Sequence, residues 1–165
     1  MRAHGAQAIL FFFTLLVFLT GVSLAGKGPT ADFEAFCVDN YDGDTLTVDI
    51  PGLLPIFGYH IKVRVKGIDT PEIKGKCEQE RKLARKARML TRRLCVGRKI
   101  ELRNCERGKY FRLVCDVVCQ GRNLASYLLD QRVARPYRGG KRKGWCSLLL
   151  GLADDRINLR NSKEK

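Results

Sequence analysis

Three stretches between residues 33 and 66 have strand composition, and in the second and third of them apolar and polar side chains alternate. This pattern restricts the fold more than any other feature. The stretches are 33–38, 45–50 and 61–66. Because successive side chains of a strand point to opposite faces, a period of two residues predicts strands with one buried face. Between them, "DNYDGDT" predicts a tight turn, and "PGLLPIFGYH" predicts a hairpin loop because of its prolines and glycines.

The second half of the chain adds helices and two more strands. Residues 77–95 place apolar side chains at helical spacing, and their acids lie in the first turn, where the helix dipole favours them. Strands are predicted at 99–104 and 111–119, and helices at 122–131 and 144–160. Five strands, with one helix after the third and two after the fifth, predict a β-rich α+β fold. The expected architecture is a five-stranded OB-fold-like barrel with three packed helices.

Residues 1–25 differ from the rest of the chain. Arg2 precedes an apolar run at 8–24, and Ala25 follows it, which is the pattern of a signal peptide cut after Ala25. The alternative is an uncleaved membrane anchor, because the run is near the lower limit for crossing a bilayer. We therefore expect residues 26–165 to form a single domain that is secreted or periplasmic, or membrane-anchored if the segment is retained.

The chain is strongly basic, with a formal net charge of +14 that becomes +13 when Arg2 is removed with the signal. Such a charge favours a polyanionic partner, since cationic side chains neutralise phosphates and release counterions. A soluble basic protein without such a partner would have the same composition, so charge alone does not decide between them.

All of the seven cysteines lie beyond residue 25, which predicts disulfides and leaves at least one cysteine unpaired within the chain. Cys77 and Cys95, at opposite ends of one helix, would be about 27 Å apart. Cys115 and Cys119, on one face of a strand, would be roughly 13 Å apart. Neither pair can bond, so Cys115 and Cys119 are core thiols or partners of other cysteines. A zinc site is not favoured, because His60 is the only histidine of this region.

Two acidic turns stand out in this basic chain, "DGDT" at 42–45 and "GIDTPE" at 67–72. Taken alone, the first is commonly an Asp-Gly turn between strands, and the second could be a surface turn neutralised by lysines. An EF-hand is excluded, because Thr45 stands where that loop needs glycine. Together the two turns supply the oxygen ligands that a hard divalent cation prefers.

The order of three motifs resembles the staphylococcal nuclease, or thermonuclease, family. "DGDT" comes first, then Arg64 five residues before the Asp of "DTPE", then "KYFR" at 109–112. The similarity covers residues 33–137, and the chain most resembles the secreted, bacterial-type members of the family. The departures are a longer hairpin loop between Ile50 and Ile61, Phe111 in place of a glycine, and the many cysteines. None of them removes a reactive group.

The resemblance implies a calcium site. By motif, Asp44 and Asp69 are the expected carboxylate ligands, the Thr70 carbonyl is a third, and Asp42 lies just outside them. The choice of Ca²⁺ rests on the resemblance, because the ligand types alone also admit magnesium and manganese.

The resemblance also implies a catalytic set. Glu72 is the expected general base acting on the attacking water, and Arg64 and Arg112 are the expected pair that grips the phosphate. Their planar forks match the phosphate oxygens, on which negative charge gathers during hydrolysis.

Three further residues are implied in substrate binding. Lys109 and Tyr110 stand where the family contacts a terminal phosphate, and Tyr137 lies near its base-stacking tyrosines. For Tyr137, packing against the last helix is the alternative. The basic stretch 138–143 either follows the nucleic-acid backbone or is a solvated loop.

One disulfide is predicted from position. Cys77 follows the acidic turn and Cys146 follows the basic stretch, and both segments are expected to border the cleft. A bond between them would fix its rim.

These expectations describe a calcium-dependent, sugar-non-specific endonuclease that hydrolyses DNA and RNA, preferably single-stranded or frayed, and leaves 3′-phosphate ends. The alternative is a catalytically inactive nucleic-acid-binding module of the same fold. We expect a monomer, and the sequence implies no stable protein partner.

Overall fold

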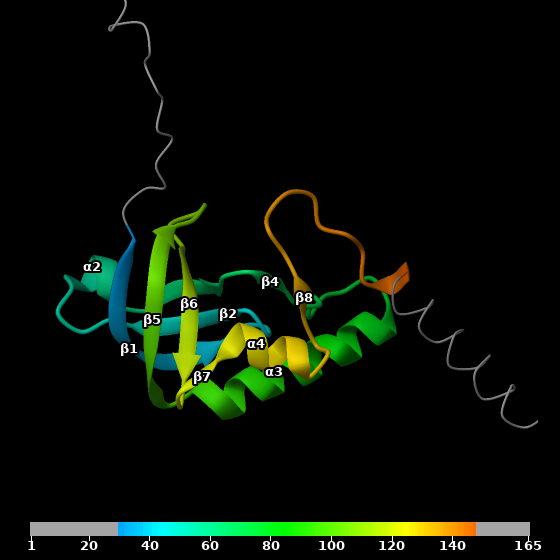
Figure 1. Cartoon of the computed structure of the whole chain (residues 1–165), viewed down its shortest axis with the longest axis horizontal. Coiled ribbons are helices and arrows are strands. Elements are labelled where there is room, and N and C mark those ends of the chain that lie inside the picture. The colour runs from blue at the N-terminus through cyan, green and yellow to red at the C-terminus, as the bar shows by residue number, and fades with distance from the viewer. Residues whose placement is uncertain (1–29, 148–165) are drawn as a thin grey trace, which may run out of the picture.

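A closed barrel of five strands forms the centre of the computed structural model, which describes residues 30–147 (Figure 1). Strand β1 pairs with both β2 and β5, and β2 and β5 pair in turn with β3 and β6. The parallel pairing of β3 with β6 closes the barrel. The five-stranded OB-like barrel predicted from the sequence is therefore confirmed. The strands are β1 (Ala31–Asn40), β2 (Thr45–Asp49), β3 (Ile61–Val65), β5 (Arg98–Arg107) and β6 (Leu113–Cys119).

Three two-residue strands lie outside the barrel wall. Strand β7 (Arg122–Asn123) continues the sheet beside β6, while β4 (Ile68–Asp69) pairs antiparallel with β8 (Arg135–Pro136). The β4–β8 pair brings the turn after β3 against the segment around residue 135. It places Asp69 opposite Arg135.

Helices α3 (Glu78–Cys95) and α4 (Leu124–Asp130) agree with the sequence prediction. Asn123 caps α4, because its side chain accepts a hydrogen bond from the amide of Ser126. Residues 146 and 147 are helical, but most of the helix expected at 144–160 lies outside the described residues, as does the signal peptide expected at 1–25. Among residues 30–147, no helix is long and apolar enough to cross a membrane.

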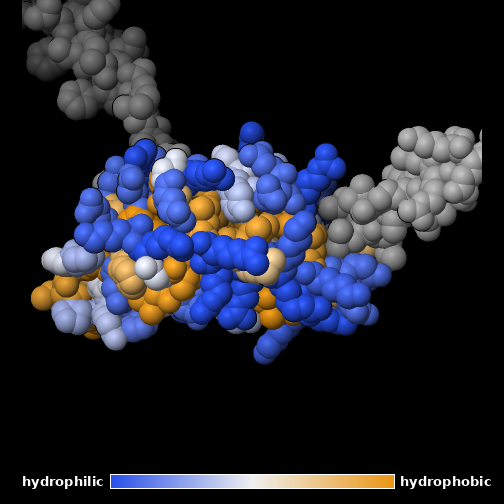
Figure 2. Space-filling view, turned by 90° about the horizontal axis from the view of Figure 1, so that it is seen from below, coloured by the Kyte–Doolittle hydropathy of each residue, from blue (hydrophilic) through white to orange (hydrophobic). Residues whose placement is uncertain are grey.

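A short helix, α2 (Pro55–Gly58), occupies the segment that was expected to be only a hairpin loop. Pro55 favours this turn of helix because its fixed φ suits a first helical position, where no amide hydrogen bond is lost. The amide of Ile50 donates to the carbonyl of Gly58 and closes the loop at 2.7 Å. Figure 2 shows hydrophobic side chains gathered at the end of the molecule where α2 lies.

The core fills the barrel and continues under α3 and α4. Leu46 and Val63 from neighbouring strands are fully buried, as are Leu124 and Leu128 from α4. Each such side chain contributes roughly 1.5–3 kcal/mol of burial free energy. The core gives the loops at the rim a rigid base.

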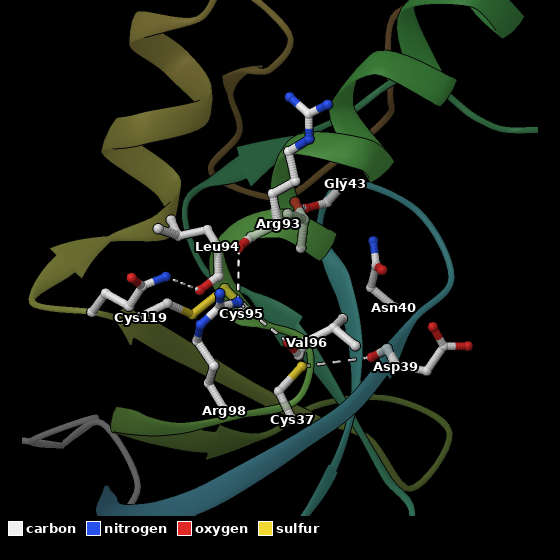
Figure 3. Close-up of a disulfide and its surroundings, with 12 residues drawn as sticks. Cys37, Asp39, Asn40, Gly43, Arg93, Leu94, Cys95, Val96, Arg98 and Cys119 are labelled. Carbon is white, nitrogen blue, oxygen red and sulfur yellow. Dashed lines mark hydrogen bonds between the residues drawn. A yellow bond between two sulfur atoms is a disulfide. The ribbon is translucent and has the colours of Figure 1, made fainter.

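Three disulfides cross-link the described residues. Cys95–Cys119 ties the end of α3 to β6 (Figure 3), and Cys105–Cys115 joins β5 to β6. Cys115 and Cys119 are therefore partners of cysteines elsewhere, which was one of the two expectations. Cys77 bonds to Cys146, the pair proposed from the sequence.

Cys37 is the free cysteine of the described residues, and Figure 3 shows it in the surroundings of the Cys95–Cys119 disulfide. Burial and the neighbouring Asp39 carboxylate raise the pKa of its thiol to about 12. The thiol is therefore protonated at neutral pH and is a poor nucleophile.

Replacing Cys95 and Cys119 together by alanine should lower the free energy of unfolding by about 3 kcal/mol, because the bond closes a loop of moderate length in the unfolded chain. Urea unfolding followed by circular dichroism measures the change. The Asp116→Asn variant, which keeps all three bonds, is the control. A loss below about 1 kcal/mol would show that the bond contributes little to stability.

Candidate active site

The two acidic turns meet on either side of a buried arginine. Asp44 lies just before β2, Arg64 lies on β3, and Asp69 lies on β4. Because β2 and β3 pair with Thr45 opposite Arg64, the guanidinium reaches both carboxylates. Its Nη1 is 2.7 Å from Asp44 Oδ1 and its Nη2 is 3.5 Å from Asp69 Oδ1.

Backbone hydrogen bonds hold the first acidic turn in place. The amide of Thr70 donates to Asp44 Oδ2 at 2.9 Å, and the amide of Asp44 donates to Asp42 Oδ1 at 3.1 Å. A Cβ atom on Gly43 would lie 2.8 Å from both Ala87 and Thr70, so only glycine fits there. The close approach packs "DGDT" against α3 and against the second turn.

Burial makes this cluster electrostatically unusual. It raises the pKa of Asp44 to about 7, and the Asp42 carboxylate adds to this effect, while Arg64 opposes it. Burial also raises the pKa of Asp42. A cation bound here would offset both the desolvation of the carboxylates and their mutual repulsion.

Two buried oxygens of the cluster accept no hydrogen bond, Asp69 Oδ1 and Thr70 Oγ1. Asp69 Oδ1 lies 3.3 Å from Arg142 Nε and 3.5 Å from Arg64 Nη2, but the geometry of a hydrogen bond is not met. Buried carboxylate and hydroxyl oxygens that accept no hydrogen bond are ligands of the type that a hard divalent cation binds. The residues present therefore fit a calcium ion.

Two arginines that the sequence did not single out contact the same cluster. Arg135 on β8 donates to Asp69 Oδ2 through Nη2 at 2.8 Å and Nε at 3.1 Å. Arg142, from the basic stretch, pairs with both Asp69 and Glu72. Trp145 packs beside Arg135 and Asp69. Its Nε1 donates to Asp69 Oδ2 at 3.2 Å, and the centre of its ring lies 4.4 Å from the Arg135 guanidinium carbon.

The turn that carries Glu72 is held from α3. Glu80, which is buried, accepts a hydrogen bond from the amide of Lys76 at 2.9 Å and a longer one from the amide of Glu72 at 3.5 Å. The Glu72 side chain itself is half exposed and forms its ion pair with Arg142. Its carboxylate is therefore oriented but accessible.

Arg112 shares a pocket with Arg64. The pocket has a volume of about 570 Å³, and Arg142 also lines it. Arg112 Nε is buried and makes no hydrogen bond. The predicted binding residues Lys109, Tyr110 and Tyr137 line the same pocket.

The backbone around Arg112 differs from the prediction. Arg112 was expected inside a strand at 111–119, but β6 begins at Leu113. Tyr110 and Phe111 have positive φ values of 59° and 54°, so the chain turns immediately before Arg112. A turn at this point interrupts the strand alternation that the sequence suggested.

Arg142 also lines a second pocket, of about 390 Å³. Asp69, Glu72 and Glu80 line it together with Cys146. The Cys77, Glu80 and Cys146 ligand atoms lie within 4.8 Å of one another. Because the two sulfurs are bonded to each other, they are not free thiolate ligands.

The Cys77–Cys146 disulfide anchors the segment that carries Arg142. Its two ends are far apart in sequence, with a separation of 69 residues. Cys77 directly precedes α3, and Cys146 follows Arg142 by four positions. The bond therefore ties the basic stretch to the turn that carries Glu72.

Comparison with protein families identifies the domain. The family model described as "Staphylococcal nuclease homologue" matches residues 62–145, which include Arg64, Asp69, Glu72 and Arg112. Comparison with individual curated proteins gives no significant match.

Replacing Cys77 and Cys146 together by serine should loosen residues 138–144 while the barrel stays intact, because the variant loses the cross-link near Arg142. Amide hydrogen exchange in this stretch should accelerate by about tenfold or more, with little change in β5. Mass spectrometry of peptides measures both. The Cys105→Ser and Cys115→Ser double variant is the control, since its bond lies away from the stretch. Unchanged exchange at 138–144 would show that other contacts hold it.

Proposed function

Because the chain belongs to the staphylococcal nuclease family, we propose that it is a calcium-dependent endonuclease that hydrolyses phosphodiester bonds of DNA and RNA. The observation that carries the proposal is the meeting of carboxylates and guanidiniums from separate segments. Asp44, Arg64 and Asp69 are in contact, and Arg112 lines the same pocket as Arg64. Hydrolysis of a phosphodiester concentrates negative charge on the phosphate oxygens, which guanidiniums and a carboxylate-bound cation would stabilise.

Arg64 and Arg112 are proposed to bind the phosphate. Arg64 is fixed by its ion pairs to Asp44 and Asp69, so its guanidinium is oriented before substrate arrives. Arg112 has a buried Nε without a partner, which a phosphate oxygen could satisfy. Two planar guanidiniums hold the equatorial oxygens as negative charge develops on them.

Glu72 is proposed to act as general base. Its carboxylate takes a proton from a water molecule as the water oxygen bonds to phosphorus, and the bond from phosphorus to the 5′-oxygen breaks. The 5′-oxygen leaves and takes up a proton, which gives a 3′-phosphate and a 5′-hydroxyl end. The half-exposed position of Glu72 leaves room for the attacking water.

Asp44, Asp69 and the carbonyl of Thr70 are proposed to hold calcium, with Asp42 as a neighbouring carboxylate that orients Asp44 through its amide. The bound ion would supply Lewis-acid polarisation of a phosphate oxygen. The buried carboxylates support this assignment, as does Asp69 Oδ1, which accepts no hydrogen bond.

Lys109, Tyr110 and Tyr137 are proposed to bind the rest of the strand. Tyr110 is exposed and free to stack on a base, while Tyr137 is half-buried and donates through its hydroxyl to the carbonyl of Gly140 at 2.7 Å. Stacking tolerates any base, which suits a nuclease without sequence preference for single-stranded or frayed DNA and RNA.

We propose that the protein works outside the cytoplasm, as a secreted or periplasmic monomer or as a membrane-anchored form. Three disulfides support an oxidising compartment. The apolar run at 8–24 supports export.

Replacing Glu72 by Gln, or Arg112 by Lys, should slow cleavage of heat-denatured DNA by about a hundredfold or more, because each change removes a group needed in the transition state. Cleavage is followed on gels with calcium or with a chelator present. Matched controls are Glu101→Gln and Arg103→Lys, an exposed pair on β5 that should keep wild-type rates.

The same assay separates the enzyme from the inactive module. Wild-type rates in both site variants would contradict the catalytic assignment. A mobility shift of the DNA without cleavage by the unaltered protein would support a binding module in place of an enzyme.

Replacing Asp69 by Asn should weaken Ca²⁺ binding by about tenfold or more, because a carboxylate ligand loses its charge. Isothermal titration calorimetry measures the affinity without relying on catalysis. Asp116→Asn, on β6, is the control and should bind Ca²⁺ as tightly as the unaltered chain. Equal affinity in the Asp69 variant would contradict the metal assignment.

A further inference from the structure

The α2 segment exposes an apolar surface that the proposed activity does not use. Its outermost side chains are Ile56, which is 72% exposed, and Leu54, which is 68% exposed. The run 50–59 contains no charged residue. We call this surface the α2 patch, and it consists of Leu53, Leu54, Ile56, Phe57, Tyr59 and Phe111.

The α2 patch is built from two segments that pack on each other. The rings of Phe57 and Phe111 have centroids 6.2 Å apart. Beneath them, Phe33 and Ile61 help to line a groove of about 180 Å³. Exposed apolar side chains gathered in this way commonly mark an interaction surface.

Basic side chains border the patch. The Arg107 guanidinium lies 5.2 Å from the centre of the Phe111 ring, and Arg112 lines the groove. Lys109 is exposed two residues before Phe111. Apolar side chains with a cationic border match the interface of an anionic bilayer, where apolar groups enter the acyl boundary and cations meet the headgroups.

We propose that the α2 patch docks onto an anionic membrane surface, with Leu54 and Ile56 inserted at the bilayer interface. In the membrane-anchored form, which keeps residues 1–25, the sequence supports this occupant, because the apolar run at 8–24 ends only six residues before β1. Six extended residues span at most about 20 Å. Phe33, near the start of β1, lines the groove, so α2 lies at the end of the barrel where β1 begins (Figure 1).

Two other occupants fit the patch less well. A nucleic-acid strand could stack on the aromatic side chains of the patch, but it would leave Leu54 and Ile56, its two most exposed side chains, without a base to contact. In a symmetric pair of chains the same patch would face itself, which would bring the Arg107 and Lys109 borders together. Like charges would then oppose association.

The test places a tryptophan in the patch and measures its depth in a bilayer. The full chain is reconstituted into vesicles of phosphatidylcholine and phosphatidylglycerol, with brominated lipids as quenchers. Ile56→Trp and the control Met89→Trp both replace exposed side chains, so folding is not at risk, and the native Trp145 is buried in both. Met89 lies on α3, away from the patch.

Shallow brominated lipids should quench the Ile56→Trp emission several-fold more than that of Met89→Trp, with a shift of the emission to shorter wavelength. Adding Leu54→Glu should return the quenching to the Met89 level. Equal quenching of the two tryptophans would overturn the proposal. So would an Ile56→Trp emission that responds to oligonucleotide, or to protein concentration, but not to vesicles.

Discussion

The burial of Arg64 between Asp44 and Asp69 is the interaction on which the candidate site depends. Both carboxylates are about 1% exposed, and removing a charge from water costs several kcal/mol unless a partner compensates it. Arg64 supplies part of that compensation from a barrel strand, where the pairing of β2 with β3 fixes its position, and Arg135 and Arg142 add to it at Asp69. This guanidinium links the two acidic turns, together with the hydrogen bond that the Thr70 amide donates to Asp44.

The surrounding charges divide the site into an acidic and a basic side. Asp42, Asp44 and Asp69 lie close together in the two acidic turns. Arg112 lines the pocket, and its Nε makes no hydrogen bond. Arg142 bridges the two sides through its pairs with Asp69 and Glu72. Under the proposed function, a cation would bind on the acidic side and the substrate phosphate on the basic side.

The sequence predicted the parts of this structure that follow a regular period. The barrel strands alternate and α3 has helical spacing, so both were found, and the motifs led to Asp44, Asp69 and Glu72. Arg135 was missed because it reaches Asp69 through the β4–β8 pair, whose strands have two residues each and leave no pattern. Arg142 was seen only as one charge of a basic stretch, since its contact with Glu72 depends on how the chain folds back after α4.

Arg112 lies at the boundary between the candidate active site and the α2 patch, because it lines both the pocket with Arg64 and the groove under Phe57. The two proposals would conflict if lipid headgroups took this guanidinium. Its position argues against that, since Arg112 is half-buried, whereas Arg107 and Lys109 are exposed at the border. Headgroups would therefore meet the two outer cations first, and Arg112 would stay available to the phosphate of a strand held beside the membrane.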